Sequence, residues 1–258
     1  MAIKYLAGDR LIGTTAEREA LITGVPTFED TYASDTGWTK IGTWIEIASG
    51  VIKMNNGGTN ADHRMHKSLG TTLSNSAWVY EFDFYMTAGR SAFATLLSSA
   101  TGNPYSATQD EIGILHDSDG SMRTLYKDGA GTGYTVGTSV GTMSNSTQYY
   151  CTMTRTTTTN VKLEVFTNAA RSTQFGSTQN QTIPSTVVDL AYIQTGTLDF
   201  GGSSSGGYWQ VDNSKVYDGV TTAPSLAYPN LPNGAIFEDS TDGKHYMFDG
   251  TSAWNEIT

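Results

Sequence analysis

Short runs of alternating apolar and polar residues, separated by clusters of Gly, Asn, Asp and Ser, fill residues 26 to 226 of this chain. A β-strand points successive side chains to opposite faces of its sheet, so such a run buries one face and leaves the other in water. In SAWVYEFDFYMT, the even positions from Trp78 to Phe84 are all aromatic, whereas the odd positions from Val79 to Tyr85 include two carboxylates. Many short runs at this spacing predict a β-sandwich or barrel.

Three hairpins can be placed within this pattern. The first joins residues 44–47 to 51–54 across an Ala-Ser-Gly turn, and the second joins 111–116 to 121–127 through the turn DSDG. The third lies in QYYCTMTRTTTTNVKLEVFT, where the three apolar residues of VKLEV share one face. About a dozen strands result, which is too many for one flat sheet and predicts two packed antiparallel sheets.

The composition agrees with a β fold and excludes two kinds of partner. Charged residues make up only 16% of the chain, Gly numbers 28, and long helical patterns are absent. The chain has 15 Lys and Arg against 25 Asp and Glu, and its net charge of −10 opposes binding to phosphate backbones. No run approaches the roughly 20 apolar residues of a membrane span. We therefore expect neither nucleic acid nor a membrane as a partner.

The N-terminal stretch MAIKYLAGDRLIG has no apolar run of signal-peptide length. The one cysteine, Cys151, lies within an alternating run, so we expect a small core residue rather than half of a disulfide. We therefore expect the chain to be made in a cytoplasm without a signal peptide. It would then reach a virion or an extracellular surface by leaving the cell within a particle.

Residues 1–25 and 228–258 lie outside the sandwich pattern of residues 26–227, and neither piece is long enough to bury a core alone. In the first piece, Thr14 and Glu17 form a capping-box pattern that predicts one or two helical turns. The second piece is predicted to form three short strands, and the two prolines of AYPNLPNG mark the linker before it. We expect the two pieces to combine into one small β module. Its expected packing residues are Tyr5, Leu11, Phe237, Tyr246, Phe248 and Trp254.

The order of four segments carries a resemblance to a known superfamily. These segments are FEDTYASDTGWTKIGTWIEIASGVIKM, HKSLGTTLSNSAWVYEFDFYMT, YYCTMTRTTTTNVKLEVF and GYWQVDNSKVYDG. Over roughly residues 26 to 220, the chain resembles the concanavalin A-like lectin/glucanase superfamily in its laminin-G-like form. The resemblance implies an all-β jelly-roll sandwich of two antiparallel sheets, one of them concave.

The two ends show a second resemblance. KYLAGDRLIGTTAEREAL and LPNGAIFEDSTDGKHYMFDGTSAWNEI are similar to segments of phage and archaeal-virus structural proteins. Those proteins carry a repeat of the form G-x-x-F-x-x-x-x-T-G-K-x-Y-x-x-D-G-x-x-W. This resemblance implies that the sandwich is inserted within a module that attaches the chain to a virion. The matching residues are Gly234, Phe237, Gly243, Lys244, Tyr246, Asp249 and Gly250, whereas Asp242 stands at the Thr position and Trp254 lies one position beyond the Trp of the repeat.

The likeness to glucanases draws attention to Glu81 and Asp83. Glucanases of the superfamily place Glu-x-Asp-x-Glu or Glu-x-Asp-x-x-Glu on one strand, with the first Glu as nucleophile and the last as general acid. Retaining hydrolysis needs two carboxyl groups about 5–5.5 Å apart. The positions for the final Glu hold Tyr85 and Met86 in this chain. We therefore expect a protein that is not an enzyme.

Glycan binding on the same face is a second interpretation of these residues. A lectin site combines a flat aromatic ring with carboxylates, amides and hydroxyls. Glu81, Asp83 and Tyr85 share a face of the predicted strand. Residues expected near that face are His116, Tyr126, Tyr134 and Trp209. The alternative is that these aromatic residues are ordinary strand formers.

Calcium is the one cofactor that the sequence suggests, through Asp117 and Asp119 of HDSDGS. Oxygen ligands at alternate positions suit Ca²⁺, but the EF-hand pattern fails because Gly, Met and Asp occupy the wrong loop positions. A tight hairpin turn accounts for the same residues. We therefore expect the turn and no bound cofactor.

Together, these features predict a non-enzymatic virion structural protein, such as a capsid decoration, fibre or tail component, that displays a lectin-like domain. Such a protein would form a homo-oligomer, with a trimer suited to a fibre, and would contact other virion proteins and surface glycans. Two alternatives stay open. One is a secreted or cell-surface carbohydrate-binding module or adhesin, and the other is a degenerate glycoside hydrolase.

Overall fold

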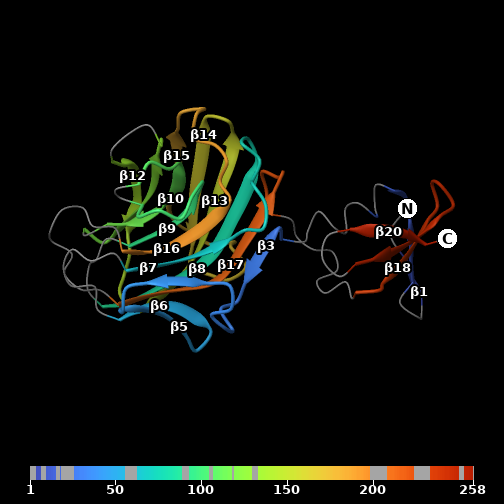
Figure 1. Cartoon of the computed structure of the whole chain (residues 1–258), viewed down its shortest axis with the longest axis horizontal. Coiled ribbons are helices and arrows are strands. Elements are labelled where there is room, and N and C mark those ends of the chain that lie inside the picture. Colours follow the sequence, from blue (N-terminus) through green and yellow to red (C-terminus); the bar gives the residue numbers. More distant parts are fainter. Residues whose placement is uncertain are drawn as a thin grey trace. The chain divides into compact units, whose positions relative to one another are not determined.

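A computed structural model of the chain confirms the predicted all-β sandwich of antiparallel sheets (Figure 1). Contacts divide the chain into a sandwich unit of residues 28–222 and a terminal unit formed by residues 1–27 and 223–258. The structure describes residues 4–6, 10–15, 18, 26–55, 63–88, 93–104, 107–117, 119–129, 133–197, 208–223, 233–249 and 253–257. Within these residues, no helix is long and apolar enough to cross a membrane.

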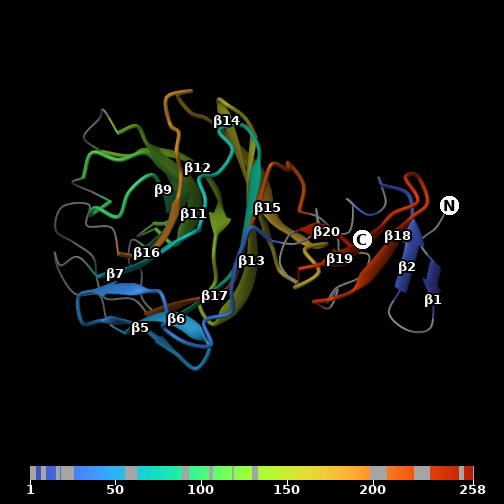
Figure 2. The same cartoon turned by 45° about the vertical axis from the view of Figure 1, so that its right-hand side comes forward.

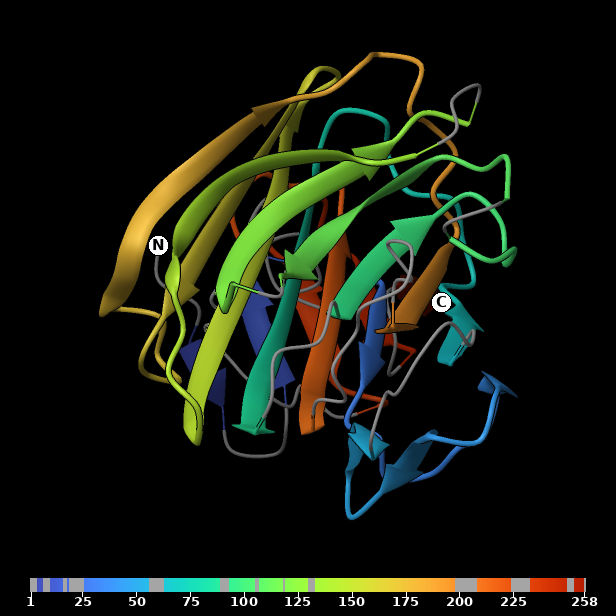
Figure 3. The same cartoon turned by 90° about the vertical axis from the view of Figure 1, so that its left-hand side faces the viewer.

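One sheet of the sandwich has seven strands and the other has eight, and Figure 3 shows that both are curved. The seven-stranded sheet runs β12 (Thr135–Thr142), β11 (Ser121–Lys127), β10 (Glu111–His116), β9 (Phe93–Ser98), β16 (Tyr192–Thr197), β7 (Arg64–Ser68) and β4 (Thr39–Ile41). The eight-stranded sheet runs β15 (Gln174–Thr182), β14 (Asn160–Phe166), β13 (Thr147–Thr157), β8 (Trp78–Ala88), β17 (Tyr208–Asp218), β6 (Val51–Asn55) and β5 (Ile45–Ala48), and β3 (Phe28–Asp30) pairs with β17.

The predicted hairpins are present with nearly the predicted bounds. Strands β5 and β6 pair from Ala48 and Val51 onward, and the two residues between them, Ser49 and Gly50, both have positive φ angles of 58° and 78°. Two successive positive φ angles define the type I′ turn, whose twist matches that of the flanking strands. Strands β10 and β11 also pair through the predicted turn, and β13 pairs with β14.

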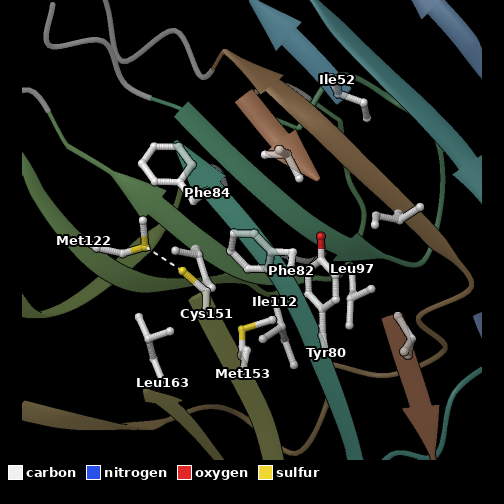
Figure 4. Packing of buried hydrophobic residues seen from close by; sticks show 14 of the residues in the cluster. Ile52, Tyr80, Phe82, Phe84, Leu97, Ile112, Met122, Cys151, Met153 and Leu163 are labelled. Carbon is white, nitrogen blue, oxygen red and sulfur yellow. Dashed lines mark hydrogen bonds between the residues drawn. The ribbon is translucent and has the colours of Figure 1, made fainter. Parts of the chain in front are cut away.

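The core lies between the two sheets, and β8 supplies several of its largest side chains. Tyr80, Phe82 and Phe84 point inward from this strand, as the alternation predicted (Figure 4). Burying one such side chain stabilises the fold by roughly 1.5–3 kcal/mol. Cys151 is a buried free thiol in the same cluster, with its Sγ 3.9 Å from the sulfur of Met122. The prediction of a small core residue at this position is therefore confirmed.

The terminal unit contains a five-stranded sheet to which both ends of the chain contribute (Figure 2). Its order is β1 (Lys4–Leu6), β2 (Arg10–Gly13), β18 (Ile236–Asp239), β19 (His245–Phe248) and β20 (Trp254–Ile257). Strands β2 and β18 are parallel, and Leu11 lies opposite Phe237. Neighbouring parallel strands from the two ends explain how two pieces too short to fold alone share one core.

Leu11 and Phe237 are buried at the centre of this sheet, and the ring of Trp254 packs 5.6 Å from that of Phe237. Phe248 is also buried, and Tyr246 packs against the same cluster. The side chain of Tyr5, together with Glu17, Gly250 and most of the predicted linker, lies outside the described residues.

Arg18 joins the two ends of the chain within this unit. Its guanidinium stacks 3.5 Å from the ring centre of Tyr246 and lies 3.2 Å from the carboxylate of Asp239. The Arg18 amide donates to the Thr14 carbonyl over 2.9 Å, which is the helical hydrogen bond expected after the predicted N-cap.

Candidate functional site

The outer face of the eight-stranded sheet carries the acidic residues that the sequence indicated. Glu81, Asp83 and Tyr85 alternate with the buried aromatic residues of β8, so all three point away from the core and are half-buried. Met86 is buried on the core side, so β8 itself offers no third carboxylate to this face. Tyr85 alone occupies the outward position at which a glucanase strand would carry its acid.

Arg171 joins the two carboxylates. It lies in the turn between β14 and β15, which the Thr167 amide closes by donating to the Thr173 carbonyl over 2.9 Å. Its Nε lies 3.3 Å from Glu81 Oε1, and its Nη2 lies 3.2 Å from Asp83 Oδ1. Arg171 has a left-handed backbone with φ of 50°, a conformation that costs energy for a residue other than glycine. The turn therefore holds a guanidinium over the outer face at some cost in backbone energy.

Asn213 binds the other oxygen of Asp83. The register of β17 against β8 shifts between Asp212 and Lys215, and Asn213 at this bulge has φ of 50°. Its side-chain amide donates to Asp83 Oδ2 over 2.8 Å. Bulges re-aim side chains and often lie beside binding sites. Asp83 is therefore held from both sides by residues with left-handed backbones.

Aromatic and amide side chains surround Asp83. Tyr150 of β13 lies directly opposite it across the strand pair, and the Arg171 guanidinium lies 5.9 Å from the Tyr150 ring centre. Gln148 of β13 and Gln210 of β17 lie opposite Tyr85 on either side. All of these side chains are half-buried, so each presents some of its surface to solvent.

A third carboxylate, that of Asp212, comes from β17, where it lies opposite Asp83. Burial raises the pKa of Glu81, Asp83 and Asp212 above their ordinary values, and Arg171 opposes this rise at Glu81 and Asp83. The carboxylates on this face therefore bind protons more readily than free side chains do.

Sequence reasoning missed Arg171, Asn213 and Tyr150. The motif W-x-x-D-N did contain Asn213, but the bulge that turns its amide toward Asp83 depends on pairing between β17 and β8. Arg171 is 88 residues from Asp83 in the sequence, so no local pattern links the two.

Three residues expected near this face lie in the core instead. His116 stacks 5.6 Å from the ring of Phe84, Trp209 is buried, and Tyr126 packs against the main core cluster. His116 and Tyr126 occupy even positions of strands whose even residues point toward the other sheet. Trp209 precedes the bulge in β17, so it shares the inward face with Val211.

Tyr134 belongs to the opposite side of the sandwich. It packs against Leu96, Leu115 and Leu125, which point outward from the seven-stranded sheet. The prediction that Tyr134 joins Glu81 and Asp83 is therefore wrong, because its side chain packs against the seven-stranded sheet.

The outer face of the seven-stranded sheet holds a buried polar network around Glu111. Gln109 donates a short hydrogen bond to Glu111 Oε1. Burial raises the pKa of Glu111 to about 7, against the opposing effects of Tyr134 and Gln109. Lys127 lies opposite Glu111 and donates to the carbonyls of Pro104 and Ala107 over 2.9 and 2.5 Å.

The rest of this network is also buried. Arg64 donates to the Thr101 carbonyl over 2.7 Å and to Gln194 over 2.9 Å. The Gln194 amide in turn donates to Ser98 and to the Ala100 carbonyl, both over 2.8 Å. Glu111, Lys127 and Gln194 are each at most 1% exposed. Because residues between β9 and β10 cover these groups, the network holds loop and sheet together rather than presenting an open site.

The weak calcium candidates serve the turn that the sequence favoured. Asp119 accepts hydrogen bonds from the amide and hydroxyl of Ser121, and Arg123 lies 2.8 Å from its carboxylate. Arg123 also lies 3.5 Å from Asp117. No group of three His, Cys, Asp or Glu side chains in the described part of the chain is arranged to hold a metal ion. That no cofactor binds stays a prediction.

No protein family and no curated protein matches this sequence, but many solved structures share its fold. The CBM2 module of the evolved Dit of Lactobacillus casei BL23 phage J-1 has a TM-score of 0.52 at 8% identity, with 77% of this chain and 97% of the module covered. The Ca²⁺/Man3GlcNAc-bound form of the VIP36 exoplasmic/lumenal domain has a TM-score of 0.54 at 7% identity, with 76% and 90% covered.

A third structure comes from work on endo-acting O-glycanases with which human gut microbiota initiate mucin breakdown. It has a TM-score of 0.50 at 11% identity, with 74% of this chain and 98% of the other covered. Identities this low establish a shared fold and leave the ligand of this chain to be argued from its own residues. The sandwich therefore has the concanavalin A-like, lectin-like fold that the order of its segments implied.

Proposed function

We propose that this chain binds a glycan on the outer face of its eight-stranded sheet, as the displayed domain of a non-enzymatic virion structural protein. One observation carries the glycan proposal: Arg171 and Asn213 hold Asp83 from both sides beside the half-buried ring of Tyr150. The opposite sheet also carries polar groups, but they are buried beneath the segment between β9 and β10, whose carbonyls accept from Arg64, Lys127 and Gln194.

The residue types on this face suit a sugar. A tyrosine ring offers a flat apolar surface for the C–H face of a pyranose, and carboxylates accept hydrogen bonds from its hydroxyl groups. Gln148 and Gln210 add groups that both donate and accept. Because Arg171 and Asn213 fix Asp83 in place, little side-chain entropy would be lost when a ligand binds.

The absence of catalysis is part of the same proposal. Arg171 contacts both Glu81 and Asp83, so each carboxylate already pairs with a guanidinium and is a weaker nucleophile than a free carboxylate. Asp212 is the observation that favours the alternative, a glycoside hydrolase, because it adds a third carboxylate opposite Asp83. Hydrolysis assays on β-glucans and mucin O-glycans decide between the two, and activity lost in Asp212→Asn would establish the hydrolase.

The attachment role is proposed for the terminal unit. Its sheet joins both chain ends through the parallel pair of β2 and β18, so the sandwich is inserted within it. Such an insertion suits a protein whose terminal unit stays bound in an assembly while the inserted sandwich is displayed. The proposed assembly is a homo-oligomer, with a trimer suited to a fibre, and mass photometry of the full chain measures it. A secreted or cell-surface adhesin would instead be recovered without other virion proteins.

A glycan array probed with the full chain, with Ca²⁺ present, tests the binding proposal. Asp83→Asn and Tyr150→Ala each remove one element of the site and are expected to weaken any signal at least tenfold, about 1.4 kcal/mol. Lys162→Ala provides the matched control, because Lys162 pairs with Glu164 over 2.8 Å on the neighbouring strand. An array without signal, or signals that survive both site variants, would refute glycan binding on this face.

A further inference from the structure

Arg155 is a fully buried cation at one end of the sandwich core. It occupies an inward-facing position of β13, next to the turn that leads into β14, and it is 0% exposed. A buried charge is tolerated when a partner of opposite charge or a complete set of hydrogen bonds compensates it.

Two of the three guanidinium nitrogens have acceptors. Nε donates to the Thr157 carbonyl over 3.3 Å, and Nη2 donates to the Thr158 carbonyl over 2.8 Å. Nη1 is buried and has no acceptor among the described residues. Both acceptors are neutral backbone carbonyls, so the positive charge itself is not matched by an ion pair in that part of the chain.

Asp110 is the carboxylate whose charge acts on Arg155, but its oxygens are already engaged. Oδ1 accepts from the Gly129 amide over 2.7 Å, and Oδ2 accepts from the Val188 amide over 3.0 Å. Burial lowers the pKa of Arg155, and Asp110 only partly opposes that effect. The nearby carboxylate thus ties two loops to the sheet instead of closing an ion pair.

Trp78 adds a second donor beside Arg155. It lies directly opposite Arg155 in the pairing of β8 with β13, and both side chains point into the core. Its indole Nε1–H is likewise buried, with no acceptor in the part of the chain that the structure describes. Directly opposed residues on one face have Cβ atoms about 4.5–5.5 Å apart. The two residues that carry these unmatched N–H donors, one of them cationic, are therefore directly opposed on the inward face of the sheet.

We propose that Arg155 and Trp78 bind a buried monovalent anion of the size of chloride. An indole N–H and a guanidinium N–H only donate, so the missing group must accept, and a buried positive charge favours an anion over a neutral acceptor. Such an ion compensates the part of the guanidinium charge that Asp110 leaves unbalanced, since Arg155 forms no ion pair with a carboxylate in the described part of the chain. The site is independent of the proposed glycan face, because both residues point to the opposite side of the sheet.

Crystals of the full chain grown or soaked in sodium bromide test the site directly. Bromide scatters anomalously, so the expected result is an anomalous peak within hydrogen-bond distance of Arg155 Nη1 and Trp78 Nε1. Density for a water at that position with no anomalous signal would overturn the proposal.

Thermal unfolding then tests whether the ion matters in solution. At constant ionic strength and pH, chloride replaces gluconate, a carboxylate too large for a buried site. Once chloride exceeds its Kd, Tm is expected to rise by about 3–5 °C for each tenfold increase in concentration. A bromide peak in crystals with no chloride dependence of Tm identifies an adventitious ion only, and that outcome also refutes a resident anion.

Two variants separate this effect from general salt stabilisation. Trp78→Phe keeps an aromatic ring but removes one donor, so it is expected to fold and to reduce the chloride dependence. Arg155→Met removes the charge and is expected to abolish it. Arg123→Met is the matched control, since its guanidinium is partly exposed and pairs with Asp119. Equal chloride dependence in wild type, Trp78→Phe and Arg123→Met would contradict the proposal.

Discussion

The Nη2 atom of Arg171 lies 3.2 Å from Oδ1 of Asp83, although the two residues are 88 positions apart in the sequence. The contact joins a turn at the edge of the eight-stranded sheet to its centre. Arg171 also lies 3.3 Å from Glu81, so one cation pairs with two carboxylates at successive outward positions of β8.

Removing Arg171 is expected to destabilise the sandwich. Arg171→Met leaves Glu81 and Asp83 as partly buried like charges, which we expect to lower the free energy of unfolding by about 1–2 kcal/mol at pH 7. Urea denaturation measures this loss. Adding Asp83→Asn removes one of the two charges, so the double variant is expected to recover part of the stability. A double variant less stable than Arg171→Met would mean that the charges are not the cause.

The buried carboxyl of Glu111 gives a pH-dependent prediction. Burial raises its pKa from 4.5 to about 7, so between these values the folded protein holds a proton that the unfolded chain has released. Stability from this group is therefore fully present below pH 4.5 and is lost as pH rises through about 7. We expect the free energy of unfolding to fall by about 3 kcal/mol between pH 4.5 and pH 8 through Glu111 alone.

Glu111→Gln isolates this contribution, because the amide cannot ionise. Urea denaturation at pH 5, 6, 7 and 8 is expected to show a flatter stability profile for this variant than for the wild type. The carboxylates around Asp83 also have raised pKa values, but they contribute the same slope to both proteins. Glu256→Gln, in an exposed part of the terminal unit, should leave the wild-type slope unchanged. Parallel profiles for wild type and Glu111→Gln would rule out the assigned role.

Most of the fold followed from the sequence because strand alternation and turn chemistry are local. The inward residues of β8 and the turn at Ser49 and Gly50 are determined by neighbours in the chain, and both were predicted. The candidate site was predicted only where it lies on one strand. Glu81, Asp83 and Tyr85 needed no partner, whereas Arg171 and Asn213 reach them through strand pairing and a bulge that no local pattern encodes.

Strand pairing also explains why some predicted site residues lie elsewhere in the structure. His116 and Trp209 were expected on the outer face because histidine and tryptophan can serve a binding face. Alternate residues of a strand point to opposite faces, however, and both side chains fall on the inward face. Which alternate residues face the core depends on how the strand pairs and on which sheet contains it. Tyr134 illustrates the second condition, since it points outward from the other sheet.

The terminal unit is expected to unfold separately when its core is damaged. Phe237 is 0% exposed and contacts Trp254, so we expect Phe237→Ala to lower the free energy of unfolding by about 3–5 kcal/mol. This loss is a large share of the total stability of a small β unit. Hydrogen exchange with mass spectrometry should then show lost protection in β2, β18 and β19, with the sandwich peptides unchanged. Ile236→Ala is the matched control, because Ile236 is the next residue on the same strand and is 37% exposed.

Gly176 in β15 permits the close approach of β12 and β15, the edge strands that meet at one side of the sandwich. It has φ of 62°, and a Cβ at this position would lie 1.9 Å from the carbonyl oxygen of Val140 in β12, an edge strand of the other sheet. Gly176→Ala therefore forces two backbones apart as well as straining the chain, and we expect a loss of about 2–4 kcal/mol in the free energy of unfolding. Gly219→Ala separates the two causes, because Gly219 has φ of 73° but a Cβ there would meet nothing within 4 Å. We expect Gly219→Ala to lower the free energy of unfolding by about 1 kcal/mol through backbone strain alone. If urea denaturation gave equal losses for the two variants, the contact between β12 and β15 would not be what makes glycine necessary at position 176.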